Sequence, residues 1–452
     1  MSRQRAAIIL AAGQGTRMKS ATPKVLHKVG GRAMVDWAID AAEAQGCAKI
    51  IVVVGGHAPA VRAHVEARLG PDAVAVQDPP LGTGHAVLAA ESALAGFTGD
   101  VVISIADAPL IRPETLSALF ALREAGAGIA VLGFEAADPT GYGRLILAED
   151  GTVARIVEQR EATPDEQAVR LCNAALYAID KAVLFSLLSM VRNDNAKGEY
   201  YLTDIVGLAR SSGFKARVAM ADEAETMGAN SRAELAEAEA AFQARARLAA
   251  MESGATLIDP NTVYFSWDTK LGQDVTVEPG VFFGPGVVVE DGAVVRAWSH
   301  LEGARVGPQA SVGPFVRLRP GADLGRKVKI GNFVEIKNAT FGEAAQASHL
   351  TYVGDAEVGA RANLGCGTIT CNYDGFDKYR TVIGEDAFIG SDTALVAPVT
   401  IGAGAHTGSG SVITKDVPAN ALAVARGRQR DIAGWAEDFR ARKRAARAAK
   451  SS

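Results

Sequence analysis

The stretch LGQDVTVEPGVFFGPGVVVEDGAVV, residues 271–295, repeats a pattern of six residues. A large apolar residue recurs at every sixth position, and glycine or an acidic residue often follows it. A period of six fits neither an α-helix nor a half-buried strand over this length. The recurring positions are Leu271, Val277, Phe283, Val289, Val295 and Leu301, then, after a slip of one residue, Val306, Val312, Leu318, Leu324, Ile330 and Ile336, and later Ile383, Ile389, Leu395, Ile401, Thr407 and Ile413.

This period predicts a hexapeptide solenoid, in which each unit forms one flat face and buries one aliphatic side chain. Three faces close a triangular coil, and the coils stack at the inter-strand spacing of roughly 4.8 Å. Such a narrow core has little room for aromatic rings, and its corners favour glycine. The composition agrees, with 48 glycines and only 6% aromatic residues.

The six-residue repeat is interrupted at two places. Ile336 to Val353 is one residue short of a full coil, and Leu364 to Ile383 is one residue over. The second interval contains NYDGFDKYR, residues 372–380, which has no inward aliphatic residue. We expect this segment to bulge out as a loop, and departures of this kind often carry function in repeat proteins.

The first half of the chain has a different pattern. Short apolar runs at 8–10, 50–54, 74–76 and 101–105 alternate with helix-like stretches. This alternation predicts an α/β domain with a mostly parallel sheet, and the continuous apolar runs indicate strands covered on both faces. The expected helices lie at 34–44, 59–69 and 85–95.

A further helix is predicted from Ser231 to Met251, where the sequence is rich in Ala, Glu and Arg. Because it separates two differently patterned halves, we interpret it as a connector, although it is equally compatible with being the last helix of the first domain. The predicted domains are therefore 1–230, a linker helix at 231–254, and 255–452 with a basic C-terminal tail.

The composition restricts the classes of protein to which this chain can belong. The 452 residues suffice for two or three domains, and a net charge of -4 with 22% charged residues indicates neither disorder nor general affinity for nucleic acid. The four cysteines have no C-x-x-C spacing, which disfavours a disulfide framework or structural zinc. No run is long enough to span a membrane. We expect a cytoplasmic protein with no nucleic-acid or membrane partner.

The segment LAAGQGTRM, residues 10–18, follows the first predicted strand. It matches neither the Walker A loop nor G-x-G-x-x-G. Gly13 and Gly15 would let the backbone approach phosphate oxygens closely, and Arg17 could meet a phosphate with its planar fork. Pro23-Lys24 adds a second cation. Taken alone, a plain tight turn would be the better interpretation.

Two other segments favour a phosphate-handling site. Asp107 follows a predicted strand and would project to the same edge of the sheet, where it could hold Mg²⁺. Leu81 to His85 forms a second glycine-containing loop that leads into a helix. His85 is better interpreted as a packing or helix-start residue, because attack by a phosphate needs no strong base.

The chain resembles the sugar-1-phosphate nucleotidyltransferases in L-A-A-G-x-G-T-R-M followed by P-K. Further motifs are similar to one branch, the bifunctional N-acetylglucosamine-1-phosphate uridyltransferase/glucosamine-1-phosphate acetyltransferases. These motifs are LGTGHA at 81–86, DPTGYGR at 138–144, IVEQREAT at 156–163, GEYYLTDI at 198–205 and GANSR at 228–232. The resemblance covers essentially the whole chain and implies a Rossmann-like nucleotidyltransferase domain followed by a left-handed parallel β-helix.

The resemblance implies synthesis of UDP-N-acetylglucosamine, a precursor of the cell wall, from glucosamine 1-phosphate, acetyl-CoA and UTP. In the first domain it implies that Arg17 and Lys24 neutralise charge on UTP, and that Asp107 and Asn230 coordinate Mg²⁺. The residues implied to bind UTP or UDP-N-acetylglucosamine are Leu10, Ala11, Ala12, Gly13, Lys24, Gln77, Gly82, Thr83, Gly143, Glu158, Asn173 and Asn230. Among them, the resemblance implies that Gln77, Gly82 and Thr83 contact uracil and ribose and that Gly143, Glu158 and Asn173 bind the amino sugar.

The chain departs from the family at two positions of the first domain. The strand before Asp107 usually ends Tyr-Gly-Asp, whereas this chain has Ile105-Ala106-Asp107. A sugar contact from that tyrosine must be missing or replaced. Pro80 stands where glutamine is often found, which affects one expected nucleotide contact.

Polar residues interrupt the apolar coils of the second half. Arg319 and Lys337 are cations suited to a sugar phosphate, and His349 lies in the first irregular interval. A lone histidine is more often structural than catalytic, but acyl transfer to an amine needs a base of moderate pKa. Glu335 precedes His349 near a coil-related position and could orient its ring.

The resemblance implies that His349 is the general base of acetyl transfer. It implies that glucosamine 1-phosphate binds to Arg319, Lys337, Tyr352 and Asn363, and that acetyl-CoA contacts Cys366, Asn372, Tyr373, Ser391, Ser409 and Arg426. Cys366 replaces a residue that is commonly alanine, and direct transfer needs no nucleophile there. In this family the acetyl site is shared between subunits of a homotrimer formed through the β-helix.

Two other functions are considered. A single-activity nucleotidyltransferase would use its solenoid only to oligomerise, and a regulatory subunit would have lost the chemistry. A single-activity enzyme should lack the residues of the acetyl site, which are Arg319, Lys337, His349, Tyr352 and Asn363. A regulatory subunit should lack Arg17, Lys24 and Asp107. Both sets are present. The basic tail at 438–450 is best interpreted as a solvated helix. A minor alternative is that it helps to bind the phosphates of CoA in the site of a neighbouring subunit.

Overall fold

The computed structural model describes residues 3–451 and divides into two compact units. The first unit extends through Ala249 and also includes Phe265–Trp267. The second comprises Ala250–Tyr264 and the chain from Asp268 onward. Helix α8 (Arg232–Glu252) lies within one residue of the helix predicted from Ser231 to Met251, and most of it belongs to the first unit.

The first unit contains a nine-stranded sheet in the order β5-β4-β1-β6-β10-β7-β11-β9-β8. Strands β1, β4, β5 and β6 run parallel, as predicted, whereas β10 is antiparallel to both β6 and β7. The strands are β1 (Arg5–Ala11), β4 (Lys49–Gly55), β5 (Val74–Gln77), β6 (Asp100–Ile105), β7 (Ile129–Glu135), β8 (Arg144–Leu147), β9 (Val153–Val157), β10 (Leu171–Asp180) and β11 (Ala216–Met220), and a small hairpin pairs β2 (Lys28–Val29) with β3 (Arg32–Ala33).

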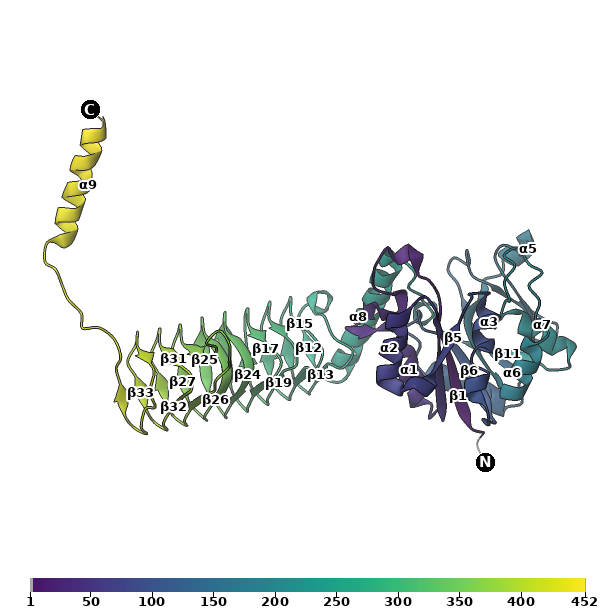
Figure 1. Cartoon of the computed structure of the whole chain (residues 1–452), viewed down its shortest axis with the longest axis horizontal. Coiled ribbons are helices and arrows are strands. Elements are labelled where there is room, and N and C mark those ends of the chain that lie inside the picture. Colours follow the sequence, from purple (N-terminus) through teal and green to yellow (C-terminus); the bar gives the residue numbers. More distant parts are fainter. Residues whose placement is uncertain (1–2, 452) are drawn as a thin grey trace. The chain divides into compact units, whose positions relative to one another are not determined.

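Helices cover both faces of this sheet (Figure 1). Successive side chains of a strand point to opposite faces, so Ile8 packs with the helices of one layer and Ile9 with those of the other. Helices α3 (Thr83–Leu88), α6 (Lys181–Leu188) and α7 (Asp204–Ser211) lie on the Ile8 side. Helices α1 (Met34–Ala44), α2 (Pro59–Leu69) and α4 (Pro113–Glu124) lie on the other side, and α5 (Pro164–Gln167) is a short surface helix. The α/β architecture is confirmed.

The predicted helices at 34–44 and 59–69 match α1 and α2 residue for residue. The third prediction, at 85–95, is wrong in its bounds, because α3 spans Thr83–Leu88 and a separate 3₁₀ turn follows at Ser92–Leu94. The early start has a tertiary cause. The Gly84 amide donates to the Tyr200 carbonyl, and the Thr83 hydroxyl accepts from the Leu202 amide, so both residues are held in the first turn.

The second unit is the expected hexapeptide β-helix, built from short parallel strands on successive coils (Figure 1). One sheet contains β12 (Thr256–Leu257), β14 (Thr276–Val277), β17 (Val294–Val295), β20 (Ser311–Val312), β23 (Lys329–Asn332), β25 (Gln346–His349), β27 (Asn363–Leu364), β30 (Phe388–Ile389), β33 (His406–Thr407) and β35 (Leu422–Ala423). The other faces form a joined sheet of β13 (Lys270–Leu271), β15 (Phe282–Phe283), β16 (Val288–Val289), β18 (His300–Leu301), β19 (Arg305–Val306), β21 (Arg317–Leu318), β22 (Ala322–Leu324), β24 (Glu335–Phe341), β26 (Tyr352–Val358), β28 (Ile369–Cys371), β29 (Thr381–Ile383), β31 (Ala394–Val396), β32 (Val399–Ile401) and β34 (Val412–Ile413).

The six-residue period predicts the core of this prism correctly. The first recurring residue, Leu271, is half-buried, and all of the later ones, from Val277 to Ile413, are buried. The short coil is also present, because Ile336 pairs with Val353 and not with Gly354, the position that three full units would reach. At the second irregularity Leu364 pairs with Ile389, well past the Val382 that three full units would reach, so the chain leaves the prism in between.

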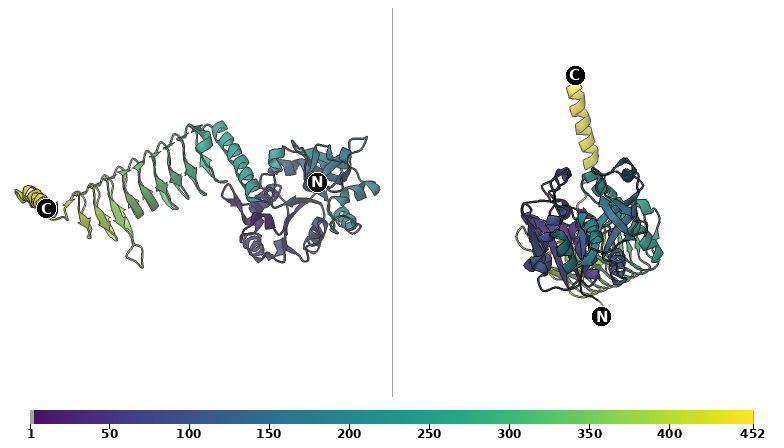
Figure 2. Two further views of the ribbon diagram at one scale, coloured as in Figure 1. Left: turned by 90° about the horizontal axis from the view of Figure 1, so that it is seen from above. Right: turned by 90° about the vertical axis from the view of Figure 1, so that its right-hand side faces the viewer.

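The expelled segment is the predicted loop at 372–380, which projects from the prism (Figure 2). Tyr373 and Lys378 close it as an antiparallel bridge, and Asp374 accepts hydrogen bonds from the Phe376 and Asp377 amides at 2.8 Å each. The Phe376 ring at its tip is 92% exposed.

The described chain ends in helix α9 (Trp435–Ser451), whose residues are exposed through Lys450. Over residues 3–451, no helix combines the length and the apolar character that a membrane span requires.

Candidate functional site

The glycine loop after β1 packs against Lys24. Gly15 has φ 63°, in the left-handed region that favours glycine, and a Cβ there would lie 2.6 Å from Lys24 Cβ. A Cβ on Gly13 would lie 4.0 Å from Lys24 Nζ. The loop therefore needs glycine both for its turn and for the close approach of this lysine.

Lys24 lies between two oxygen ligands that are distant in sequence. Its ammonium pairs with the carboxylate of Asp107, just beyond the end of β6, and donates to Asn230 Oδ1 at 3.0 Å. Asn230 is itself held by Glu234, whose carboxylate accepts from the Asn230 amide at 2.8 Å and from Nδ2 at 3.1 Å. The amide oxygen is thereby directed toward Lys24.

Asp107 and Asn230 fit a magnesium ion bound together with a nucleotide. Mg²⁺ typically takes one or two protein oxygens and completes its shell with phosphate oxygens and water. Within residues 3–451, no group of three or more His, Cys, Asp or Glu side chains forms an all-protein metal site. The pair at Lys24 offers two protein oxygens to such an ion.

A cleft of about 470 Å³ opens beside Lys24 at the carboxyl ends of β1 and β6. It is lined by Leu10, Ala11, Ala12, Gly13, Gln14, Lys24, Val25, Gln77, Pro80, Gly82, Thr83, Ala86, Ile105, Asp107 and Glu199. Most residues expected to hold the nucleotide thus surround one cavity. The departures from the family pattern, Pro80 and Ile105, face the same cavity.

The back of the cleft is held by Gln77, which is buried at the end of β5. Its Nε2 lies 2.9 Å from the Gly82 carbonyl and 3.2 Å from His85 Nδ1. His85 therefore supports the loop from the first turn of α3, consistent with the packing role suggested by the sequence.

Arg17 lies outside this lining. It sits in the 3₁₀ turn Thr16–Met18 and is exposed. Its charge still reaches Glu234: burial acts to raise the pKa of that carboxyl, but hydrogen bonds from Asn230 and Ser231, together with Arg17, leave the pKa below its ordinary value. Arg17 is therefore near the Asn230 side of the site.

The residues expected to bind the amino sugar form a second group. The Asn173 amide donates to the Gly143 carbonyl at 2.8 Å, and a Cβ on Gly143 would lie 3.7 Å from Glu158 Oε1. Thr203 donates its hydroxyl to the same Glu158 oxygen at 3.3 Å. Burial raises the pKa of Glu158, and the Thr203 hydrogen bond only partly opposes this shift.

The segment 199–203 joins the two groups. Its Tyr200 amide donates to the Leu81 carbonyl at 2.8 Å, next to the cleft, and its Thr203 reaches Glu158. Glu199 lines the cleft itself. The sequence contains GEYYLTDI here, but the pattern alone assigned no role to these residues, because only the folded chain brings them to both subsites.

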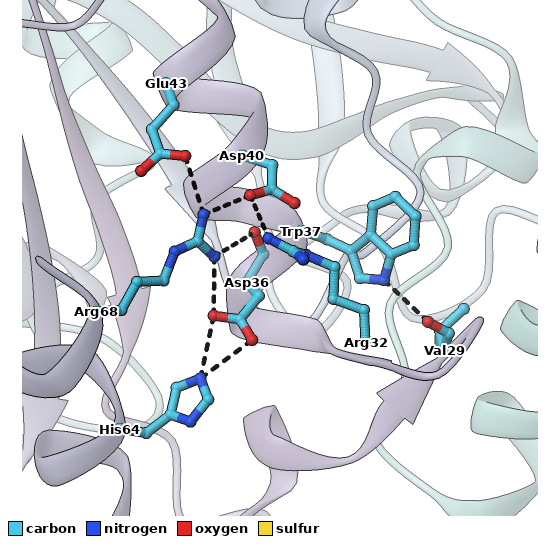
Figure 3. Close-up of polar contacts among 8 residues, drawn as sticks. All are labelled: Val29, Arg32, Asp36, Trp37, Asp40, Glu43, His64 and Arg68. Atoms are coloured by element: carbon cyan, nitrogen blue, oxygen red, sulfur yellow. Dashed lines mark hydrogen bonds and ion pairs between the residues drawn. The ribbon is translucent and has the colours of Figure 1, made fainter. Parts of the chain in front are cut away.

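A polar network braces helices α1 and α2 of this domain (Figure 3). The Arg68 guanidinium pairs with Asp36, Asp40 and Glu43 on α1, and His64 Nε2 lies 3.0 Å from Asp36 Oδ1. Burial acts to raise the pKa of Asp36, but hydrogen bonds from Arg68 and His64 hold it below its ordinary value. This network fixes the helices that follow the Lys24 segment.

In the β-helix, His349 ends strand β25 at a corner of the prism and is exposed. Its Nδ1 lies 3.1 Å from Oδ1 of Asn332, its register partner on β23. The expected Glu335–His349 pairing is wrong. Glu335 pairs with Arg319 at 2.9 Å, and its own register partner is Tyr352, because one coil leads from Asn332 to His349 and from Glu335 to Tyr352.

The expected sugar-phosphate ligands lie around this corner. Arg319 and Lys337 occupy corresponding positions on successive coils, since the Arg319 amide bonds the Ile336 carbonyl. Tyr352 begins β26 just after His349, and Asn363 begins β27, the neighbour of the His349 strand.

Lys378, on the loop at 372–380, is a further cation that the sequence pattern did not single out. It lies close enough to Lys337 to lower the pKa of that lysine, with Arg319 adding to the effect. Near these cations lies Asp355, which accepts from Asn338 at 2.6 Å and also from Asn372. The two lysines and Arg319 leave positive charge that suits a phosphate dianion.

Four of the expected acetyl-CoA contacts, Cys366, Ser391, Ser409 and Arg426, form a column along one edge, whereas Asn372 and Tyr373 lie at the base of the loop at 372–380. The Cys366 carbonyl accepts from Asp392 and the Ser391 carbonyl from Gly410, so Cys366, Ser391 and Ser409 occupy equivalent positions on successive coils. Arg426 Nη1 donates to the Ser409 carbonyl at 2.6 Å. At roughly 4.8 Å per coil, the column extends over about 14 Å, which accommodates an extended arm such as pantetheine.

Comparisons with known proteins agree with both halves of the chain. Residues 7–182 match the MobA-like NTP transferase domain, and residues 380–415 match the bacterial transferase hexapeptide (six repeats). A bifunctional GlmU protein from Maricaulis maris is 58% identical over 452 residues, covering 100% of both chains. Those from Caulobacter vibrioides and Paramagnetospirillum magneticum are 58% and 53% identical, covering 98% of this chain and 96% and 98% of theirs.

Such identity over nearly the full length, with a nucleotidyltransferase domain and a hexapeptide domain in the same order, excludes a single-activity enzyme as the better interpretation. The chain belongs to the family of bifunctional GlmU proteins, the uridyltransferase and acetyltransferase enzymes that synthesise UDP-N-acetylglucosamine.

Proposed function

We propose that the cleft beside Lys24 carries out uridylyl transfer and that the corner at His349 carries out acetyl transfer. The carrying observation is that each unit has its own polar constellation. Lys24 converges with Asp107 and Asn230 over the glycine loop, whereas the β-helix holds His349 bonded to Asn332 and a cluster of the cations Arg319, Lys337 and Lys378.

For acetyl transfer, His349 removes a proton from the amine of glucosamine 1-phosphate. The amine nitrogen attacks the thioester carbon of acetyl-CoA, the C–S bond breaks, and CoA leaves as the thiol. An amide oxygen can only accept, so Asn332 Oδ1 fixes the proton on His349 Nδ1 and leaves the Nε2 lone pair free as the base. Arg319, Lys337 and Lys378 hold the sugar phosphate, and the column from Cys366 to Arg426 holds acetyl-CoA.

For uridylyl transfer, a phosphate oxygen of N-acetylglucosamine 1-phosphate attacks the α-phosphorus of UTP, and pyrophosphate leaves. Gln77, Gly82 and Thr83 hold the uridine, while Gly143, Glu158 and Asn173 hold the amino sugar. Lys24 and Arg17 neutralise the triphosphate charge, so positioning and electrostatic stabilisation carry this step. Mg²⁺ bound by Asp107 and Asn230 would supply further charge stabilisation on the phosphates.

We also propose that the chain forms a homotrimer through the β-helix. Trp298, Phe315, Phe333 and Leu350 form a column of apolar side chains on successive coils, each 48–61% exposed. The rings of Phe315 and Phe333 stack at 5.3 Å, and Leu350 directly follows His349. Continuous exposed apolar surface of this kind marks an interface. A column beside the base is consistent with an acetyl site completed by a neighbouring copy.

A coupled assay tests the division of labour. The full chain is supplied with glucosamine 1-phosphate, acetyl-CoA, UTP and Mg²⁺, and free thiol and pyrophosphate are measured separately. We expect both products, with pyrophosphate dependent on prior acetylation. Production of pyrophosphate from unacetylated sugar without thiol release would support a single-activity enzyme.

Light scattering tests the proposed trimer. The double variant Phe315→Glu with Phe333→Glu should lower the molar mass of the particle in solution, while Lys270→Glu on another face should not.

A further inference from the structure

Tyr177 is a buried tyrosine in the middle of the central sheet. It lies on β10 opposite Ile103 of β6 and Val131 of β7, and it is 1% exposed. The pairing of β10 with β7 shifts register between Asn173 and Tyr177, and Ala175 within this bulge has φ 59°. The bulge brings the Asn173 side chain back onto the tyrosine.

Both ends of the Asn173 carboxamide are bonded by the protein. Nδ2 donates to the Tyr177 hydroxyl at 2.8 Å, and Oδ1 accepts from the Ala175 amide at 3.1 Å. The backbone amide of Asn173 is also fixed, on the Gly143 carbonyl at 2.8 Å. The carboxamide is therefore held in one of its two flip states, with one Nδ2 hydrogen left over for a ligand.

The hydroxyl of Tyr177 has no packing function, since phenylalanine would occupy nearly the same volume. Burying a hydroxyl costs free energy unless it is hydrogen-bonded. Among residues 3–451, Asn173 is its one hydrogen-bond partner. Burial raises the pKa of the Tyr177 phenol, and the Glu158 carboxylate adds to the shift, so the phenol stays neutral. The effect of Glu158 also shows that Tyr177 lies near the carboxylate proposed to bind the sugar.

We propose that Tyr177 is a positioning residue for the sugar-phosphate subsite, where its hydroxyl holds the Asn173 carboxamide in the orientation that binds the amino sugar. This inference rests on the proposed role of Asn173 as a sugar ligand. Tyr177 itself touches no substrate in this scheme. Its effect is confined to the sugar side of the reaction, because the nucleotide cleft is held by Gln77 and the glycine loop.

The test uses Tyr177→Phe in the full chain. The KM for N-acetylglucosamine 1-phosphate, measured by pyrophosphate release at saturating UTP, should rise about three- to tenfold, as expected for one lost neutral hydrogen bond. The KM for UTP, kcat and acetyl transfer should stay within about twofold of wild type. Tyr379→Phe, which removes a hydroxyl bonded to Asp374 at 3.0 Å in the other domain, is the control for uridylyl transfer and should change neither of its KM values nor its kcat.

A double-mutant cycle separates positioning from general support of the fold. Asn173→Ala alone should raise the KM for the sugar phosphate, and adding Tyr177→Phe should raise it no further. Equal effects of Tyr177→Phe in both backgrounds, or an increase in both KM values accompanied by a lower melting temperature, would overturn the proposal. If Asn173→Ala raises the sugar KM but Tyr177→Phe does not, only the positioning role fails. If Asn173→Ala has no effect, the proposed sugar site fails as well.

Discussion

The Nδ1 atom of His349 lies 3.1 Å from Oδ1 of Asn332, one coil earlier on the same sheet. The carboxyl that the sequence suggests as its partner, Glu335, is instead occupied by Arg319. The group that orients the proposed base is therefore a neutral amide.

His349→Ala should separate the two activities. Loss of a general base costs about 10²- to 10⁴-fold in rate, so thiol release should fall by that amount. Pyrophosphate release from pre-acetylated sugar should be unchanged, because the uridylyl residues lie in the other unit. A parallel loss of both activities would contradict the assignment of two sites.

Asn332→Asp should change the pH dependence of acetyl transfer. A carboxylate beside the ring would stabilise the imidazolium over the neutral form. Since the base must be deprotonated, the acidic limb of the rate profile for thiol release should move to higher pH. Asn420→Asp, on a distant coil, provides the control. An unshifted limb would show that Asn332 does not orient the reacting ring.

Asp107→Asn should weaken the metal dependence of uridylyl transfer. Removing a carboxylate ligand should raise the Mg²⁺ concentration for half-maximal pyrophosphate release by at least about tenfold. Thiol release should be unaffected. The exposed Asp72→Asn serves as a charge-matched control in the same domain, and an identical Mg²⁺ response in the two variants would argue against Asp107 as a ligand.

Gly143→Ala should block the sugar subsite at little cost in stability. The added Cβ would lie 3.2 Å from Ile156 Cγ2 and 3.7 Å from Glu158 Oε1, and the φ of Gly143 lies outside the left-handed region. We expect the KM for N-acetylglucosamine 1-phosphate to rise about tenfold or more, equivalent to about 1.4 kcal/mol. A normal KM with an unchanged melting temperature would place the sugar elsewhere.

Arg68→Met should destabilise the first domain by about 2 kcal/mol, because Asp36 and its neighbours lose a half-buried partner. The Asp36 pKa is depressed in the fold, so this contribution is present at neutral pH and is lost as the pH falls below about 4. Urea unfolding should show the difference from wild type shrinking on acidification. The exposed Arg62→Met, which loses only its pair with Glu66, should cost less than about 0.5 kcal/mol at any pH.

The elements with a periodic signal were predictable from local patterns. The six-residue step identified the inward residues of the β-helix, and the loop at 372–380 was predictable because it lacks one. Helices α1 and α2 were likewise predictable to the residue. Each of these features depends on neighbours within a few positions, where hydrophobic period and local propensity decide the outcome.

Which side chains meet in the sites depends on how distant segments fold together. Lys24 contacts Asp107 and Asn230, which are 83 and 206 residues away, because strand ends converge at one edge of the sheet. The antiparallel insertion of β10 and its bulge, which join Asn173 to Tyr177, leave no periodic trace. Asn332 replaces Glu335 beside His349 because the register of successive coils aligns it with the histidine. Such contacts depend on strand order and register, which cooperative packing of distant segments sets and which a local pattern does not encode.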